Sequence, residues 1–184
     1  MAKYLSTRRS VYNRGKPPIW FLDALVTWAR RTPLAFFAPN KRRDVYWSVA
    51  SVLGPWEGLE HRRAVMCEIL RVLAGFESSW TMDVGRDHTN PNVDSPLNEE
   101  AGLFQVSPDS MDLDRSLWIF IDERLKSTDP QAFLKAMKTD AQLAIEYAAM
   151  VLRVTTRHHG PVRDGKINAH LRRAAVEEFE RLLL

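Results

Sequence analysis

The chain has 184 residues, a usual length for a single domain, and 45% of them are hydrophobic, which is enough for a buried core. The formal net charge is +3, and the single cysteine, Cys67, excludes an internal disulfide. We expect Cys67 to be a small buried residue. No cofactor or metal site is expected, because there is no cysteine pair and the histidines lack ligand spacing. A calcium ion in an acidic loop is the alternative left open.

Two basic clusters lie near the N-terminus. The first is formed by Lys3, Arg8, Arg9, Arg14 and Lys16, and the second by Lys41, Arg42 and Arg43. We expect residues 1–17 to form a basic arm, solvated and partly disordered, ahead of one domain over residues 18–184. Such clusters can bind nucleic acid. The rest of the chain is nearly balanced in charge and carries no nucleic-acid motif, so we expect an anionic cell wall, not nucleic acid, as the partner of this surface.

The first half of the chain predicts helices over residues 18–30 and 44–53, and a longer one from residue 57 to about residue 80. The apolar run at residues 19–26 is short and is interrupted by Asp23, so it does not resemble a secretory signal. No stretch approaches the roughly twenty apolar residues needed to cross a membrane. We therefore expect no membrane span.

The long helix carries a carboxylate at an unusual place. Its apolar face is formed by Val65, Ile69, Val72, Leu73, Phe76 and Trp80. Glu77 follows Met66, Leu70 and Leu73 on a neighbouring ridge, where another apolar residue would fit. Burial raises the pKa of a carboxyl group, and a general acid must still hold its proton near neutral pH. Glu77 is therefore either a candidate acid or a solvated residue at the rim of the helix.

The second half of the chain also predicts helices. Residues 81–100 lack periodicity and form a long polar loop, which is either functional or a tolerated surface insertion. A helix is expected over residues 116–126. Capping boxes at residues 128–131 and 139–142 predict two more helix starts, the first with a proline in the first turn. The last helix is expected to begin near Asn168.

Two motifs resemble those of the lytic transglycosylase and goose-type lysozyme superfamily. They are Glu77-Ser78-Ser79-Trp80 and the segment from Ala101 to Pro108, which correspond to the Glu-Ser and Gly-Leu-x-Gln motifs. The match covers roughly residues 60–157. It implies a mainly α, lysozyme-like helical domain, with a long polar loop or a small hairpin in residues 81–106 beside the active-site cleft.

The resemblance also implies roles for individual residues. Glu77 would be the catalytic acid, and Gly102, Leu103 and Gln105 would line the sugar cleft. Ser78 and Gln105 would orient the acid or bind sugar. Trp80 and Phe104 are either platforms for sugar rings or core residues.

One part of the family pattern is missing. The superfamily usually carries a tyrosine-containing motif late in the domain, whereas this chain reads Thr156-Arg157-His158-His159-Gly160-Pro161. His158 and His159 either replace the tyrosine as sugar contacts or form a polar helix end, where histidine is favourable at the negative end of the helix dipole.

The type of reaction depends on whether a second carboxylate takes part. An inverting hydrolase needs a general base that activates water. Asp87 and Asp94 in the polar loop are our candidates, with loop capping as their alternative role. A transglycosylase needs no such base, because the 6-hydroxyl of the sugar attacks and leaves a 1,6-anhydro product.

The expected function is that of a muramidase, which cleaves the β-1,4 bond between N-acetylmuramic acid and N-acetylglucosamine in peptidoglycan strands. The expected setting is a type VI secreted antibacterial effector, made in the cytoplasm without a signal peptide and active in the periplasm of a rival cell. An immunity protein would then block its cleft. The alternatives are a lytic transglycosylase, a phage endolysin, or a non-catalytic wall-binding or structural module.

Overall fold

The computed structural model describes residues 3–85 and 95–184 of the chain. This part is mainly α-helical, as the sequence predicts. The α-helices are α1 (Ile19–Arg31), α2 (Val45–Leu53), α3 (Leu59–Ser78), α4 (Arg115–Leu125), α5 (Pro130–Thr139), α6 (Ala141–Val154), α7 (Gly160–Arg163) and α8 (Arg173–Leu183). Shorter 3-10 helices are η1 (Leu34–Phe37), η2 (Gly102–Phe104), η3 (Pro108–Leu113) and η4 (Lys166–Ala169). In place of a hairpin, the described residues contain an isolated antiparallel bridge between Ala101 and Val106.

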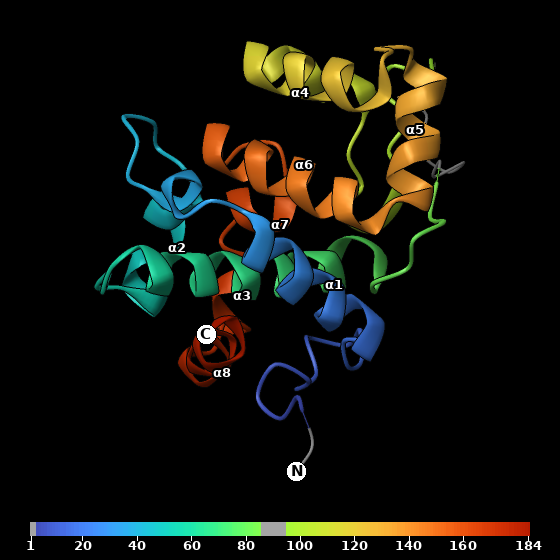
Figure 1. Ribbon diagram of the computed structural model, residues 1–184. Coiled ribbons are helices and arrows are strands. Elements are labelled where there is room, and N and C mark those ends of the chain that lie inside the picture. The colour runs from blue at the N-terminus through green and yellow to red at the C-terminus, as the bar shows by residue number, and fades with distance from the viewer. Residues whose placement is uncertain (1–2, 86–94) are drawn as a thin grey trace.

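The helix α3 is the centre of the fold. It runs across the middle of the molecule, with α6 above it and α8 below it in Figure 1, and α1 also packs against it. Residues 64–75 are buried without interruption, Cys67 among them. The sequence predicted a helix with one apolar face, whereas the neighbouring helices cover α3 on all sides over these three turns. Two charged residues are therefore buried together with the apolar ones.

These two residues, Glu68 and Arg71, form a fully buried ion pair. The distances are 2.6 Å from Nε of Arg71 to Oε2 of Glu68 and 2.8 Å from its NH2 to Oε1. Arg71 also donates to the carbonyl oxygen of Arg9, and Glu68 accepts from the backbone N–H of Arg172. The pair thereby connects the N-terminal segment, the central helix and the residue before α8.

The N-terminal segment is not the solvated arm that its composition suggested. The carboxylate of Glu178 on α8 accepts hydrogen bonds from the backbone N–H groups of Leu5 and Thr7 and from the hydroxyl of Thr7. Tyr4 and Val11 are buried in the hydrophobic core. The basic side chains of the segment stay exposed, which is why composition alone indicated a disordered arm: Arg8, Arg9, Arg14 and Lys16.

The helix starts lie close to the predicted positions, but the capping residues of α5 and α6 lie one position later than predicted. Asp44 caps α2 and Asp114 caps α4, each by accepting from a backbone N–H two residues later. The predicted capping boxes placed threonines at the caps of α5 and α6. The structure instead uses the following aspartates, Asp129 and Asp140, whose carboxylates accept backbone N–H bonds of the first turn. Charged oxygens accept stronger hydrogen bonds than hydroxyls, which favours this register.

The last helix begins later than predicted. The pattern placed its start near Asn168, but α8 begins at Arg173 and residues Lys166–Ala169 form the 3-10 helix η4. Ile167 and Leu171 are buried as expected, so their apolar spacing reflects packing of a loop and a short helix. In the described ranges, no helix combines the length and the apolar character that a bilayer span requires. The same residues contain no group of three or more His, Cys, Asp or Glu side chains arranged to hold a metal ion.

Candidate functional site

Glu77 lies one residue before the C-terminal end of α3. The chain then turns sharply, because Ser79 and Trp80 both adopt the left-handed conformation, with φ of 52° and 60°. The Glu77 side chain is 18% exposed, and its Oε1 lies 3.4 Å from Nδ1 of His159. The carboxyl group is therefore largely screened from water while part of it still reaches the surface.

His159 comes from the segment just before α7 and is almost fully buried. Its Nε2 is also buried, and this atom has no hydrogen-bond partner among the described residues. An unpartnered buried polar atom is unfavourable, and a catalytic role is one of the explanations for it. His158 packs edge-on against His159, with the ring centroids 4.8 Å apart. Burial and the neighbouring imidazole lower the pKa of His158 to about 4, so His158 is neutral at pH 7.

Ser78 joins the two motif segments. Its hydroxyl is buried, and the hydroxyl oxygen lies 2.9 Å from the carbonyl oxygen of Leu103, to which it can donate, and 3.2 Å from that of Ala74. The Leu103 contact connects residues 25 positions apart in the sequence. Ser78 therefore links the end of α3 to the turn of η2, and it is the residue next to Glu77 in the sequence.

The turn after Ala101 depends on glycine. Gly102 has φ of 73°, and a Cβ at this position would lie 2.2 Å from the carbonyl oxygen of Met137 on α5. The N–H of Gly102 donates to the carbonyl oxygen of Val84, at the described end of the polar loop. The Gln105 side-chain amide donates to the Gly102 carbonyl oxygen at 2.8 Å. Gln105 thus stabilises the turn, with its side chain partly buried against the backbone.

Three residues expected to contact sugar are core residues instead. Trp80, Leu103 and Phe104 are buried, and the Trp80 indole N–H donates to the carbonyl oxygen of Arg71. A ring that is covered by protein offers no face for a sugar to stack on. The sugar-platform interpretation of Trp80 and Phe104 is therefore wrong for this structure, and their alternative role in the core holds. Asp87 and Asp94 lie outside the described residues.

A partly exposed aromatic stack was not predicted. The Tyr12 ring lies nearly parallel to that of Phe76, at a centroid distance of 5.7 Å and an angle of 11°. His170 packs edge-on against both rings. Phe76 is the residue before Glu77, but Tyr12 belongs to the N-terminal segment that composition indicated to be disordered. The apolar spacing of α3 pointed to Phe76, whereas nothing in the local sequence pointed to its partner.

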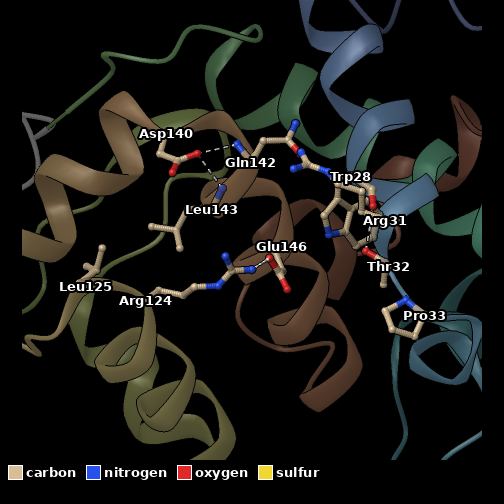
Figure 2. Close-up of a pocket in the computed structure, with 10 residues that line it drawn as sticks. All are labelled: Trp28, Arg31, Thr32, Pro33, Arg124, Leu125, Asp140, Gln142, Leu143 and Glu146. Carbon is tan, nitrogen blue, oxygen red and sulfur yellow. Dashed lines mark hydrogen bonds and ion pairs between the residues drawn. The ribbon is translucent and has the colours of Figure 1, made fainter.

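A pocket of about 270 Å³ lies elsewhere, between α1, α4 and the first turns of α6 (Figure 2). None of the candidate site residues lines it. Its charged groups bind one another or the backbone: Arg124 pairs with Glu146, and Asp140 accepts the N–H groups of Gln142 and Leu143. These contacts hold the helices together, so we place the candidate site at Glu77 and not in this pocket.

Comparison of the chain with models of known protein families, with curated proteins and with solved structures finds no match. The functional interpretation therefore depends on the motif residues and on the contacts described above.

Proposed function

We propose that the chain is a lysozyme-like muramidase that hydrolyses the bond between N-acetylmuramic acid and N-acetylglucosamine in peptidoglycan. The observation that carries this proposal is the meeting of three distant segments at the end of α3. Ser78 bonds to the turn that contains Gly102 and Gln105, and His159 lies beside Glu77. Residues of the two short motifs thus lie together in the fold, and His159 lies beside them.

Two features of Glu77 support its assignment as the general acid. Its carboxyl group would donate a proton to the glycosidic oxygen as the bond to the leaving sugar breaks. With 18% of its side chain exposed, it is shielded from water but still within reach of a substrate. We assign His159 as a positioning residue, because its Nδ1 lies 3.4 Å from the Glu77 carboxylate and its own ring is held by burial.

The water that completes hydrolysis needs a base. We propose Asp87 or Asp94 for this role, on the grounds that the polar loop bearing them leaves α3 just after Glu77. Inverting enzymes place the two carboxyl groups roughly 6.5–9.5 Å apart, which leaves room for the water.

The products distinguish the hydrolase from a transglycosylase. We expect purified sacculi to yield muropeptides with a free reducing end, because water is the nucleophile. Mass spectrometry of the digest measures this directly. Products lighter by one water, in the 1,6-anhydro form, would replace the hydrolase with a transglycosylase while leaving Glu77 as the acid. Release of no muropeptides at all would reject both enzymes.

We further propose that the enzyme acts as an antibacterial effector, delivered by a type VI machine into the periplasm of a rival cell, and that a small immunity protein blocks the site around Glu77. The argument is one of substrate location. Peptidoglycan lies outside the cytoplasmic membrane, so the enzyme harms a Gram-negative cell only from the periplasmic side.

Toxicity should therefore depend on compartment. Expressed in a Gram-negative host, the chain fused to a secretion signal should lyse the cells, and the chain without the fusion should not. Optical density and viable counts measure lysis, and Glu77→Gln in the fused form is the matched control that should be harmless. Equal toxicity of the two forms would point to a cytosolic target instead of peptidoglycan.

A further inference from the structure

The helix α2 presents an exposed tryptophan. Trp47 is 67% exposed, compared with 45% for Trp20 and 44% for Trp118. An exposed indole ring is unfavourable, because its large apolar surface stays in contact with water. Nothing in the packing of α2 requires a tryptophan at this position, because the buried face of the helix is formed by other residues: Val45, Tyr46, Val49 and Leu53.

Two hollows are lined by Trp47, and both also have Asn40 in their walls. One, of about 290 Å³, is lined by the half-buried Trp56 and by three buried residues, Asp44, Tyr46 and Arg62. The other, of about 370 Å³, is lined by the basic residues Lys41, Arg42 and Arg43. The indole ring of Trp47 therefore borders both a hollow that contains a second indole, that of Trp56, and a hollow lined by basic residues. We call this region the Trp47 surface.

Among the residues that the structure describes, two of the three cations of this surface have no carboxylate partner. Arg42 pairs with Asp114. Within residues 3–85 and 95–184, neither Lys41 nor Arg43 forms an ion pair. The nearest carboxylate in the sequence, Asp44, is buried and is already bound to Arg153. Two cations thus remain available to an anionic ligand.

The aromatic side of the surface is held in place. Tyr46 packs edge-on against Trp56, and its hydroxyl donates to the carbonyl oxygen of Arg62. The Arg62 guanidinium lies over the Tyr46 ring, 3.7 Å from its centroid. Asn40 fixes the basic loop, because its side chain accepts from the Arg42 N–H and donates to the carbonyl oxygen of Arg153. A ligand would meet a largely preformed surface, which lowers the entropy lost on binding.

We propose that the Trp47 surface is a second binding site for peptidoglycan strands, separate from the site of cleavage. The apolar face of a sugar ring would stack on the indole of Trp47, and the carboxylates of the attached peptides would pair with Lys41 and Arg43. Stacking suits the exposed ring, and the unpaired cations suit an anionic polymer. The choice of polymer rests on the proposed function.

The position of the surface favours a polymer over a single sugar. Arg62 lies near the start of α3 and Glu77 near its end, and a helix rises about 1.5 Å per residue, so the two lie roughly 22 Å apart along the axis. Figure 1 shows α2 beside the N-terminal part of α3. A long strand can occupy both places, and binding at the Trp47 surface would keep the enzyme on its substrate between cuts.

The test is co-sedimentation with insoluble sacculi, with every variant made in the Glu77→Gln background so that the polymer stays intact. Trp47→Ala should weaken binding roughly tenfold, an effect within the range of aromatic stacking. The double change Lys41→Ala/Arg43→Ala should weaken it by a similar factor and remove most of its salt dependence. Raising salt from about 0.01 M to about 1 M shortens the screening length from about 30 Å to about 3 Å. Binding of the chain that retains Lys41 and Arg43 should therefore weaken as salt is raised.

Trp20→Ala is the matched control, because it removes another exposed indole from a different helix. It should bind sacculi as tightly as the parent, and all variants should keep the parent's circular dichroism. Unchanged binding by Trp47→Ala overturns the proposal, as does a chain that does not bind sacculi. The proposal is also overturned if the Trp47→Ala variant binds sacculi normally but has lost affinity for an acidic protein. The surface would then be a protein interface. Because binding is measured without cleavage, loss of binding in the Trp47 variant would support the proposal even if Glu77 proved not to be the acid.

Discussion

Glu77→Gln should lower the rate of sacculus clearing by about 10² to 10⁴-fold, because general acid catalysis contributes a factor of this size. Glutamine has nearly the shape of glutamate, but its amide cannot donate a proton to the leaving glycosidic oxygen. The side chain would keep its place beside His159 at the end of α3. The fold should therefore survive, with an unchanged melting temperature, while turbidity clearing is lost.

Glu60→Gln provides the control, since Glu60 is an exposed glutamate in the first turn of the same helix. It removes the same charge from α3 without touching the candidate site, so clearing should stay at the wild-type rate. If Glu77→Gln clears sacculi at nearly that rate, Glu77 is not the acid. If both variants lose activity, the effect is one of charge on the helix and not of proton donation.

The helices were largely predictable because most of them carry their own local signals. The starts of α1, α2 and α4 fall within one residue of the expected positions. Asp44 and Asp114 cap two of these helices with side-chain bonds to nearby N–H groups. Such contacts are encoded within a few residues of sequence. The start of α8 was missed, since the apolar spacing of Ile167 and Leu171 also fits a short 3-10 helix and a loop.

The motifs pointed to residues that come together in the fold, but they did not show how those residues are arranged. The motifs identified Ser78 and Gly102, and the structure adds that the Ser78 hydroxyl and the Leu103 carbonyl join them. The role of Trp80 could not be predicted, because it depends on how the chain turns after α3. The left-handed turn brings the indole onto Gly75, where an added Cβ would lie 2.7 Å from the ring. A motif does not reveal whether its aromatic residue faces solvent or the core.

Long-range contacts explain the remaining differences. Glu178 holds Thr7 from 171 residues away, so no local pattern could show that the basic N-terminal segment is ordered. The Glu68–Arg71 pair was missed for a related reason. Charged residues three positions apart on a helix usually face solvent, and only the packing of neighbouring helices shows that these two are buried.

Breaking this buried pair should have a large effect on stability. Arg71→Met should lower the free energy of unfolding by roughly 3–5 kcal/mol, the range seen when one partner of a buried pair is removed, because Glu68 would keep a buried charge without its counterion. The bond from Arg71 to the Arg9 carbonyl oxygen would be lost as well. Chemical denaturation followed by circular dichroism measures the change.

Two further variants separate the buried charge from the loss of an arginine. Glu68→Leu/Arg71→Met removes both charges and should recover much of the loss, since apolar residues of similar volume often replace a buried pair without penalty. Arg124→Met breaks the pair with Glu146, in which the side chains are 53% and 29% exposed, and should cost no more than about 1 kcal/mol. If Arg71→Met is no worse than Arg124→Met, leaving Glu68 without its counterion costs little and the prediction is wrong. A large loss confined to Arg71→Met would instead show that α3 does not tolerate an unpaired buried carboxylate two turns before Glu77.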